Sequence, residues 1–307
     1  MPSKNDIKRK ISNHRDAGGK IVPGVPAHNV AVNYMKMLSD YTGRNVIAYY
    51  SSFPASDYGY SSMVNEWDIS GFMKAMNGLD TSKGLDLILQ TPGGVPTAAE
   101  GIVEYLQAEF KGDIRVIVPY GAFSAGTLIS CAAKTIILGK HSFLGPVDPQ
   151  LGRDACLNII KEFDMAREDV IANPDSLGYW QIRLRDYPSG IYMICKDAVA
   201  LGDELLSKWL RRYMFAEESG KDLDNKVRRI YRKLNSNNNS HSRHFGYEFC
   251  KDLGLKVEQL EADAELHDLV LGVHHAMEFA VSENGLAKFI ISNKGEYYAL
   301  SSSNSQE

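Results

Sequence analysis

Apolar and polar residues are grouped in blocks between residues 45 and 139, and the blocks show two different periods. Four short apolar runs, bounded by glycine, proline or polar residues, are typical of buried strands. Between two of these runs, Ile69, Phe72 and Met76 recur at a spacing that places them on one helical face. The expected strands are 45–53, 84–91, 114–119 and 134–139, and the expected helices are 65–76 and 95–110. This alternation predicts an α/β fold with parallel βαβ units.

The pattern changes at about Ala155, where long segments of helical spacing begin. Helices are expected at 156–170, 191–218, 223–234, 245–254 and 262–281. A final hairpin over 286–300 is expected to turn at Asn293, Lys294 and Gly295. The first 30 residues or so are rich in polar residues, glycine and proline and predict an irregular arm. The predicted organisation is an N-terminal arm over 1–40, a main domain over 41–260, and a helix and hairpin extension over 261–307.

Composition narrows the function only slightly. The chain has 307 residues, 44% hydrophobic and 23% charged, with a formal net charge of −4. This balance is typical of a globular protein, and an acidic chain is not expected to bind nucleic acid. No run approaches the ~18 apolar residues that a membrane-spanning helix needs, so no membrane span is expected.

The cysteines and histidines do not form a recognisable ligand motif. The four cysteines are far apart and form no CxxC pair: Cys131, Cys156, Cys195 and Cys250. Neither a disulfide framework nor a zinc site is expected, and a reducing, cytoplasmic location fits best. His274 and His275 are neighbours on a predicted helix and point about 100° apart, a poor arrangement for chelating one ion. We therefore expect no metal and no cofactor.

Two loops carry the strongest chemical signal. Gln90–Gly94 (QTPGG) follows one buried strand, and Tyr120–Gly126 (YGAFSAG) follows the next strand along the chain. Since neighbouring parallel strands end at the same edge of a sheet, these loops are expected to lie together. Ser124 would then be a nucleophile beside backbone donors, from Ala125 and from the glycines at 93 and 94. The alternative is a packing role for a small-residue helix start and a common glycine turn.

Taken together, the segments around TPGG, SAGT and LGPVDPQLG resemble the serine dehydrogenase proteinase family. This family is part of the Clp-protease/crotonase superfamily, which also includes signal peptide peptidase A. The resemblance is strong over about 45–152 and weak from there to Val257. It implies a serine protease domain over 41–260, built as a ClpP/crotonase-like spiral of βαβ units with a C-terminal helical section. It places Ser124 at the nucleophile and Gly93, Gly94 and Ala125 at the oxyanion hole.

The residue that activates Ser124 is left open by the sequence, because the histidine of the Clp peptidase has no counterpart here. Around the expected place stands Asp148, which is assigned either to a turn between prolines or to orienting a base. His241 is the first candidate base, against the simpler reading of a surface loop histidine, and His244 is a weaker substitute. Lys161 is the alternative base, placed like the lysine of Ser-Lys relatives, and requires a burial-lowered pKa.

The function that follows is a serine peptidase acting on peptide or protein substrates, without a cofactor. The resemblance further implies a homo-oligomer. Two alternatives stay open: a catalytically silent ClpP-like scaffold or binding subunit, and a crotonase-like acyl-CoA enzyme that uses the same backbone donors to hold an enolate.

Overall fold

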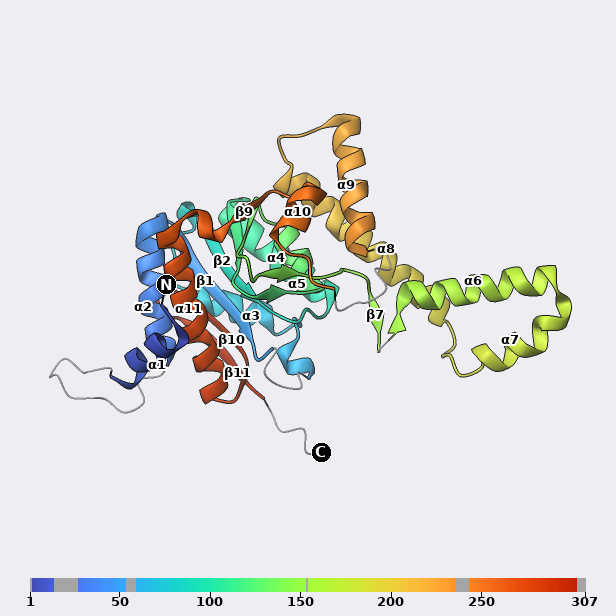
Figure 1. Ribbon diagram of the computed structural model, residues 1–307, viewed down its shortest axis with the longest axis horizontal. Helices are drawn as coiled ribbons and strands as arrows, with labels where there is room; N and C mark the ends of the chain where they lie inside the picture. Colours follow the sequence, from blue (N-terminus) through green and yellow to red (C-terminus); the bar gives the residue numbers. More distant parts are fainter. Residues whose placement is uncertain (1, 14–26, 54–58, 153, 236–242, 303–307) are drawn as a thin grey trace.

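The computed structural model describes residues 2–13, 27–53, 59–152, 154–235 and 243–302. A seven-stranded, mostly parallel sheet lies at its centre, with the strand order β11-β10-β1-β2-β3-β5-β9 (Figure 1). These strands are β1 (Asn45–Ser51), β2 (Leu85–Gln90), β3 (Ile114–Val118), β5 (Thr135–Leu138), β9 (Val257–Gln259), β10 (Leu286–Ser292) and β11 (Tyr297–Ser301). β10 pairs antiparallel with β1, and β11 antiparallel with β10, while the other strand pairs are parallel.

The four strands expected from the apolar runs are confirmed as β1, β2, β3 and β5, and the C-terminal hairpin is confirmed as β10 and β11. Short strands outside the main sheet are β4 (Gly121–Ala122), β6 (Phe143–Leu144), β7 (Gln150–Leu151) and β8 (Asp154–Ala155). β4 pairs in parallel with β6, and this two-residue ladder comes just before Ser124. The strand β9 was not expected, because only three residues of it pair with the sheet.

Helices cover both faces of the sheet (Figure 1). The α-helices in the described part of the chain are α1 (Lys4–Ser12), α2 (Ala27–Thr42), α3 (Asp68–Ala75), α4 (Pro96–Phe110), α5 (Ala125–Cys131), α6 (Cys156–Ala172), α7 (Leu177–Leu184), α8 (Ile191–Trp209), α9 (Gly220–Asn235), α10 (Tyr247–Leu253) and α11 (Ala264–Glu283). Side chains alternate along each strand, so Ile47 belongs to the apolar cluster that includes residues of α3, α4 and α5, while Val46 belongs to the cluster with residues of α2 and α11. The molecule therefore has two hydrophobic layers, one on each side of the sheet.

The N-terminal region differs from the expected polar arm. Lys4–Ser12 is a helix that Ser3 caps through a capping box with Asp6, and the side chain of Ile7 is fully buried. α2 then packs along α11. Helices from both ends of the chain therefore cover the same face of the central sheet. The domain boundaries proposed from the sequence stay a prediction.

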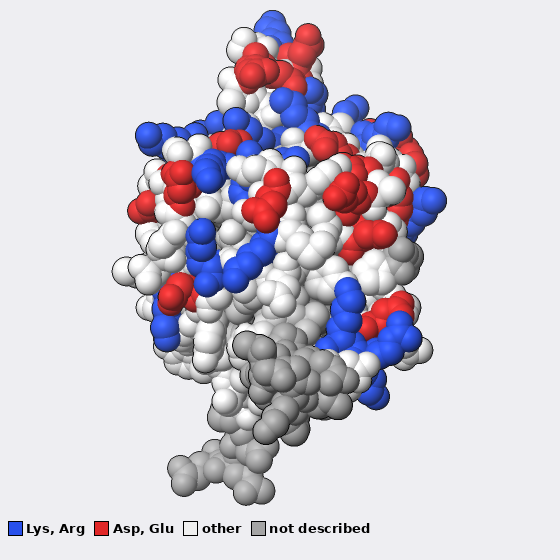
Figure 2. All heavy atoms as spheres, turned by 90° about the vertical axis from the view of Figure 1, so that its left-hand side faces the viewer, with Lys and Arg blue, Asp and Glu red and all other residues white. Residues whose placement is uncertain are grey.

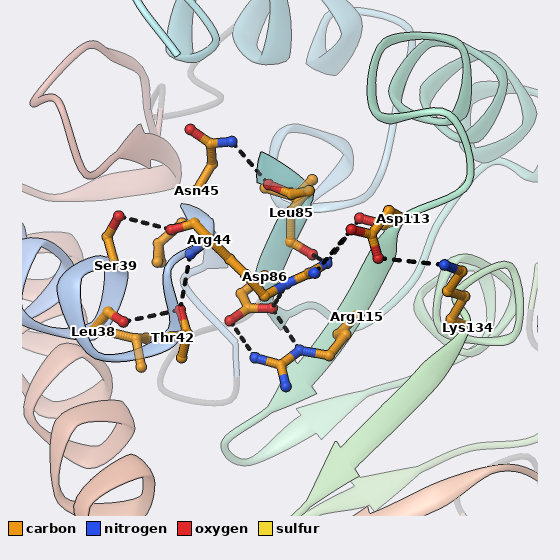
Figure 3. Close-up of polar contacts among 12 residues, drawn as sticks. Leu38, Ser39, Thr42, Arg44, Asn45, Leu85, Asp86, Asp113, Arg115 and Lys134 are labelled. Atoms are coloured by element: carbon orange, nitrogen blue, oxygen red, sulfur yellow. Dashed lines mark hydrogen bonds and ion pairs between the residues drawn. The ribbon is translucent and has the colours of Figure 1, made fainter. Parts of the chain in front are cut away.

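An ion-pair network fixes the amino ends of the central strands (Figure 3). The carboxylate of Asp86, on β2, is fully buried and contacts two guanidinium groups. Arg44 Nε donates to Asp86 Oδ1 over 2.8 Å, and Arg115 Nη2 donates to Asp86 Oδ2 over 2.7 Å. Arg44 also reaches Asp113 Oδ2 over 3.0 Å. The network ties three strands together at one edge of the sheet and leaves the carboxyl edge to the loops that follow the strands.

Residues from α6, α7 and the first part of α8 form an arm that projects from the body of the molecule (Figure 1). A small core of its own, around Cys156, Ile159, Ile191 and Cys195, holds α6 against α8. Large apolar side chains are exposed along this part of the chain: Leu151, Met165, Ile171, Leu177, Tyr179, Ile182, Met193 and Ile194.

None of the helices in the described part of the chain combines the length and the apolar character needed to cross a lipid bilayer.

Candidate active site

Ser124 lies at the start of α5, directly after β4. Its backbone has φ 50° and ψ −113°, and Lys111 is the other non-glycine residue with positive φ in the described part of the chain. Such a conformation is costly for a residue with a Cβ, and it persists only where the surroundings impose it. Strain of this kind is concentrated at functional sites, which favours chemistry over simple packing for this serine.

The glycine loop predicted to lie beside Ser124 does so. Gly93 has φ 100°, and a Cβ built on it would lie 2.5 Å from the carbonyl oxygen of Phe123 and 2.7 Å from the Cβ of Ser124. Gly94 has φ 155°, and a Cβ there would lie 2.3 Å from the carbonyl oxygen of Val64. Glycine is therefore required at both positions, for space and for backbone conformation.

Backbone hydrogen bonds fix this loop and leave two amides without partners. Val64 donates its amide to Gly93 O over 2.8 Å and accepts the Val95 amide over 2.9 Å. Within the described residues, neither the Gly94 amide nor the Ala125 amide donates a hydrogen bond. Unpaired amides on two adjoining loops, next to a serine, are the arrangement that binds a developing oxyanion.

Thr91 joins the two loops and was not singled out by the sequence. It donates its amide to Gly121 O over 3.0 Å and accepts the Phe123 amide over 3.1 Å. Its hydroxyl accepts the Gly93 amide over 3.1 Å. One buried residue therefore sets the distance between the glycine turn and the strand that leads into Ser124.

A buried ion pair supports the backbone that pairs with the glycine loop. Lys288 Nζ, from β10, donates to the Met63 carbonyl over 2.6 Å and to Asp68 Oδ1 over 2.5 Å. The hydroxyl of Tyr49 donates to Asp68 Oδ2 over 2.9 Å. Neither charged side chain has any exposure.

Burial dominates the ionisation of this group. It lowers the pKa of Lys288 and raises the pKa of Asp68, while the attraction between the two charges opposes both shifts. Burial, and then the negative charge of Asp68, raise the pKa of Tyr49, and the hydroxyl of Thr91 acts in the opposite direction. The only sequence signal for this network was a single lysine in the apolar run LAKFIIS.

His244 lies close to the loop that contains Ser124. Its ring is edge-on to Phe123, at 5.2 Å between centroids, and edge-on to Phe143 at 5.0 Å. Hydrogen bonds between Leu144 and Phe245, of 3.0 and 2.8 Å, bring this part of the chain beside β6. His241 lies outside the described residues. His244, three residues later in the chain, contacts Phe123, the residue before Ser124.

The other two sequence candidates lie at the base of the arm. Asp148 is 5% exposed and accepts a hydrogen bond from Gln150 Nε2 over 2.6 Å. Burial chiefly raises the pKa of the nearby Cys156 thiol, and Cys195 and the negative charge of Asp148 add to the shift. Lys161 is an exposed residue of α6 and lines a hollow together with Glu162 from the same helix. In the described part of the chain, no hydrogen bond or ion pair joins Lys161 to Ser124.

The comparison with known protein families agrees with this geometry. Residues 63–176 match the family model of the ClpP-like SDH-type serine proteinases. The match confirms the resemblance expected from the sequence, and it includes the glycine loop, Ser124 and Asp148. His244 and Lys288 lie outside the ClpP-like match, so their placement comes from the structure.

Two curated relatives share part of this region. An uncharacterized protein of Methanocaldococcus jannaschii is 41% identical over 102 residues, which cover 33% of this chain and 35% of the relative. A second uncharacterized protein of the same organism is 31% identical over 173 residues, or 56% of this chain and 51% of that protein. The chain spans about half the length, or less, of these relatives.

Proposed function

We propose that this protein is a serine peptidase that cleaves peptide bonds through an acyl-enzyme on Ser124. The observation that carries the proposal is the strained backbone of Ser124, held against a glycine loop whose Gly94 amide is unpaired. The match to the ClpP-like serine proteinase family over residues 63–176 supports the same chemistry.

In this mechanism the Ser124 hydroxyl oxygen attacks the carbonyl carbon of the scissile bond, and a base takes its proton. The amides of Gly94 and Ala125 stabilise the negative charge that develops on the carbonyl oxygen. When the carbon–nitrogen bond breaks, the protonated base gives its proton to the leaving amine. Water, deprotonated by the same base, then hydrolyses the ester on Ser124 and restores the hydroxyl.

We propose His244 as that base, in place of His241, the first candidate from the sequence. The proximity of its ring to Phe123 supports this role, because Phe123 directly precedes the nucleophile. A base must come within ~2.6–3.2 Å of the hydroxyl, a distance that often forms only with substrate bound. His241 and Lys161 remain the competing assignments, and Asp148 is proposed to orient the base or contact substrate.

Labelling with a fluorophosphonate, which reacts with activated serines, tests the nucleophile. We expect the wild-type protein to be labelled and Ser124→Ala to be unlabelled, because the reacting oxygen is gone. Ser130→Ala, in the same helix, is the matched control. It should label normally, since the Ser130 hydroxyl donates a hydrogen bond within the helix, to Gly126 O. A folded wild-type protein that never labels would contradict the proposal and favour the silent scaffold.

The base is assigned by comparing three variants. We expect His244→Gln to slow labelling by about 10²–10⁴-fold, the usual worth of general-base catalysis. His241→Gln and Lys161→Met should label at the wild-type rate. A loss confined to His241→Gln or to Lys161→Met would move the assignment to that residue.

We further propose that the protein acts on peptide or protein segments as a homo-oligomer in the cytoplasm, and that its βαβ units form the spiral typical of this superfamily. The exposed apolar side chains on the arm support assembly, because apolar surface of this extent commonly marks a protein interface. The parallel pairing of β4 with β6, outside the main sheet, supports the spiral. A main domain over 41–260, flanked by 1–40 and 261–307, is part of the same proposal.

A further inference from the structure

A second cluster of ionisable side chains lies on the opposite face of the sheet from Lys288 and Asp68, on α11. It consists of His274, His275 and Glu278, and one ligand atom from each lies within 4.8 Å of the other two. His274 Nε2 is 3.9 Å from Glu278 Oε2, and His275 Nδ1 is 3.7 Å from the same oxygen. The carboxylate, one turn further along the helix, therefore faces both rings, although the rings are sequence neighbours.

The surroundings of the cluster orient its ligand atoms. The Nδ1 atom of His274 is hydrogen-bonded to the hydroxyl of Tyr50 over 3.1 Å, which leaves its Nε2 facing Glu278. A histidine that binds a metal through one nitrogen commonly engages the other in such a bond. The Nδ1 atom of His275 is buried and has no partner at hydrogen-bond distance within the described residues. A buried nitrogen of this kind costs free energy unless something binds it.

A positive charge already lies at this position. Lys4 Nζ, from α1, is 3.1 Å from Glu278 Oε2, and both side chains reach the surface. Acidic and basic side chains are intermixed over the face of the molecule on this side (Figure 2). The carboxylate is thus balanced by a flexible lysine that is able to move aside, rather than by a buried partner.

We infer that His274, His275 and Glu278 form a binding site for one divalent transition-metal ion, which displaces the ammonium of Lys4. Two imidazole nitrogens and a carboxylate oxygen are a set that suits zinc, iron, cobalt or nickel and leaves further coordination positions open. The proposal departs from the expectation of no metal, which rested on the scattered cysteines and on the angle between two adjacent histidines.

Titration calorimetry with zinc chloride on the full chain, stripped with a chelator, tests the site. We expect one equivalent to bind, and His275→Ala and Glu278→Gln each to weaken binding at least tenfold. His267→Ala is the matched control, because His267 is on the same helix and has its own carboxylate, Asp268, 3.9 Å away. It should bind like wild type. Binding that is absent, or that survives both ligand substitutions, overturns the proposal.

Two further measurements separate metal binding from a structural role of these side chains. Zinc should raise the melting temperature of the wild type and of Ser124→Ala but not that of Glu278→Gln, so the site can be tested apart from the peptidase proposal. Lys4→Gln should tighten zinc binding by up to about fivefold, because it removes a competing cation that contributes as a surface ion pair. Unchanged or weaker binding in Lys4→Gln would contradict an ion at the Lys4 position.

Discussion

Gly94 and Ser124 hold backbone conformations that their neighbours impose. The loop at Gly94 lies against Val64, with no space for a side chain, and the serine has a positive φ between β4 and α5. At the scale of the residue, the backbone therefore determines the geometry of the site. Tight contacts between main chains set the positions of Ser124, the proposed nucleophile, and of the two amides, and the side chains of Thr91 and Lys288 support those main chains.

Gly94→Ala tests whether this placement matters. A Cβ at this position would meet the Val64 carbonyl oxygen at 2.3 Å and would be strained at φ 155°. The loop must shift, so we expect fluorophosphonate labelling of Ser124 to slow by about 10²–10³-fold, the worth of one oxyanion donor. Gly101→Ala, in α4, meets only one side-chain atom at 3.8 Å and should label normally. Equal rates for the two variants would remove Gly94 from the proposed oxyanion hole.

The sequence was most informative where function depends on local backbone. A glycine pair after one strand and a serine among small residues after the next predicted the two loops and their meeting. The role of Thr91 cannot be predicted from the sequence. A threonine whose hydroxyl accepts the amide two residues later looks, in sequence, like any threonine at the end of a strand. The sequence does not show that His244 lies beside Phe123, because only the pairing of Phe245 with Leu144 brings that part of the chain there.

At the scale of the element, β1 separates two polar networks. Consecutive residues of a strand face opposite sides of a sheet, so Tyr49 reaches Asp68 while Tyr50 reaches His274. The first network supports the glycine loop, and the second orients the proposed metal site. The first network depends on β10, because this strand pairs with β1 and supplies the Lys288 ammonium.

Lys288→Met keeps an unbranched side chain but removes the charge. It leaves Asp68 buried without its cation and the Met63 carbonyl without a donor, a change that usually costs about 3–5 kcal/mol. We expect a lower free energy of unfolding in urea and slower labelling of Ser124 under native conditions. Normal labelling in a folded Lys288→Met protein would show that the ion pair stabilises the fold without positioning the loop.

Asp86→Asn provides the matched stability control at the opposite edge of the sheet. Its carboxylate is fully buried between Arg44 and Arg115, so we again expect a loss of about 3–5 kcal/mol in urea unfolding. Ser124 should label at the wild-type rate, because this network lies at the amino ends of the strands. In the partly exposed pair of Asp224 with Arg211, the substitution Asp224→Asn should cost only about 0–1 kcal/mol.

Element prediction succeeded where the period was long and regular. The five helical segments expected after residue 155 and the hairpin at 293–295 follow from spacing and turn chemistry, and the structure has a helix in each segment and the hairpin. The segment expected over 191–218 ends as an α-helix at Trp209 and continues as a π-helical turn over Leu210–Met214. α1 was missed because its mean character is polar, and a capping box and one buried isoleucine stabilise it against α11 and α2. α7, on the arm, was missed because its apolar residues Leu177 and Ile182 are exposed and mark no buried face.

At the scale of the whole molecule, the arm is the feature that a single chain does not explain. Ile171 is 76% exposed and Ile182 is 68% exposed, on a projection with only a small core of its own. Such a surface is stable in water when a partner covers it, and a second copy of the chain is the simplest partner.

Ile171→Asp combined with Ile182→Asp tests assembly through the arm. Because a charge in an apolar interface is costly, we expect the variant to have a smaller mass than the wild type in light scattering after gel filtration. Met37→Asp, at a residue of α2 that is 54% exposed, places a charge on the body instead and should leave the mass unchanged. A wild type that is monomeric at micromolar concentration would contradict the proposal.

The place of Lys288 in the chain has a consequence for the order in which the protein matures. Ribosomal synthesis makes Ser124 and the glycine loop long before it makes β10, the strand that supplies the cation beneath Met63. A growing chain, or one cut before β10, therefore has Ser124 and both amides but lacks part of their support. Reactivity of Ser124 should then appear late, only once the last strands have joined the sheet, which would protect the nascent chain from premature hydrolysis by itself.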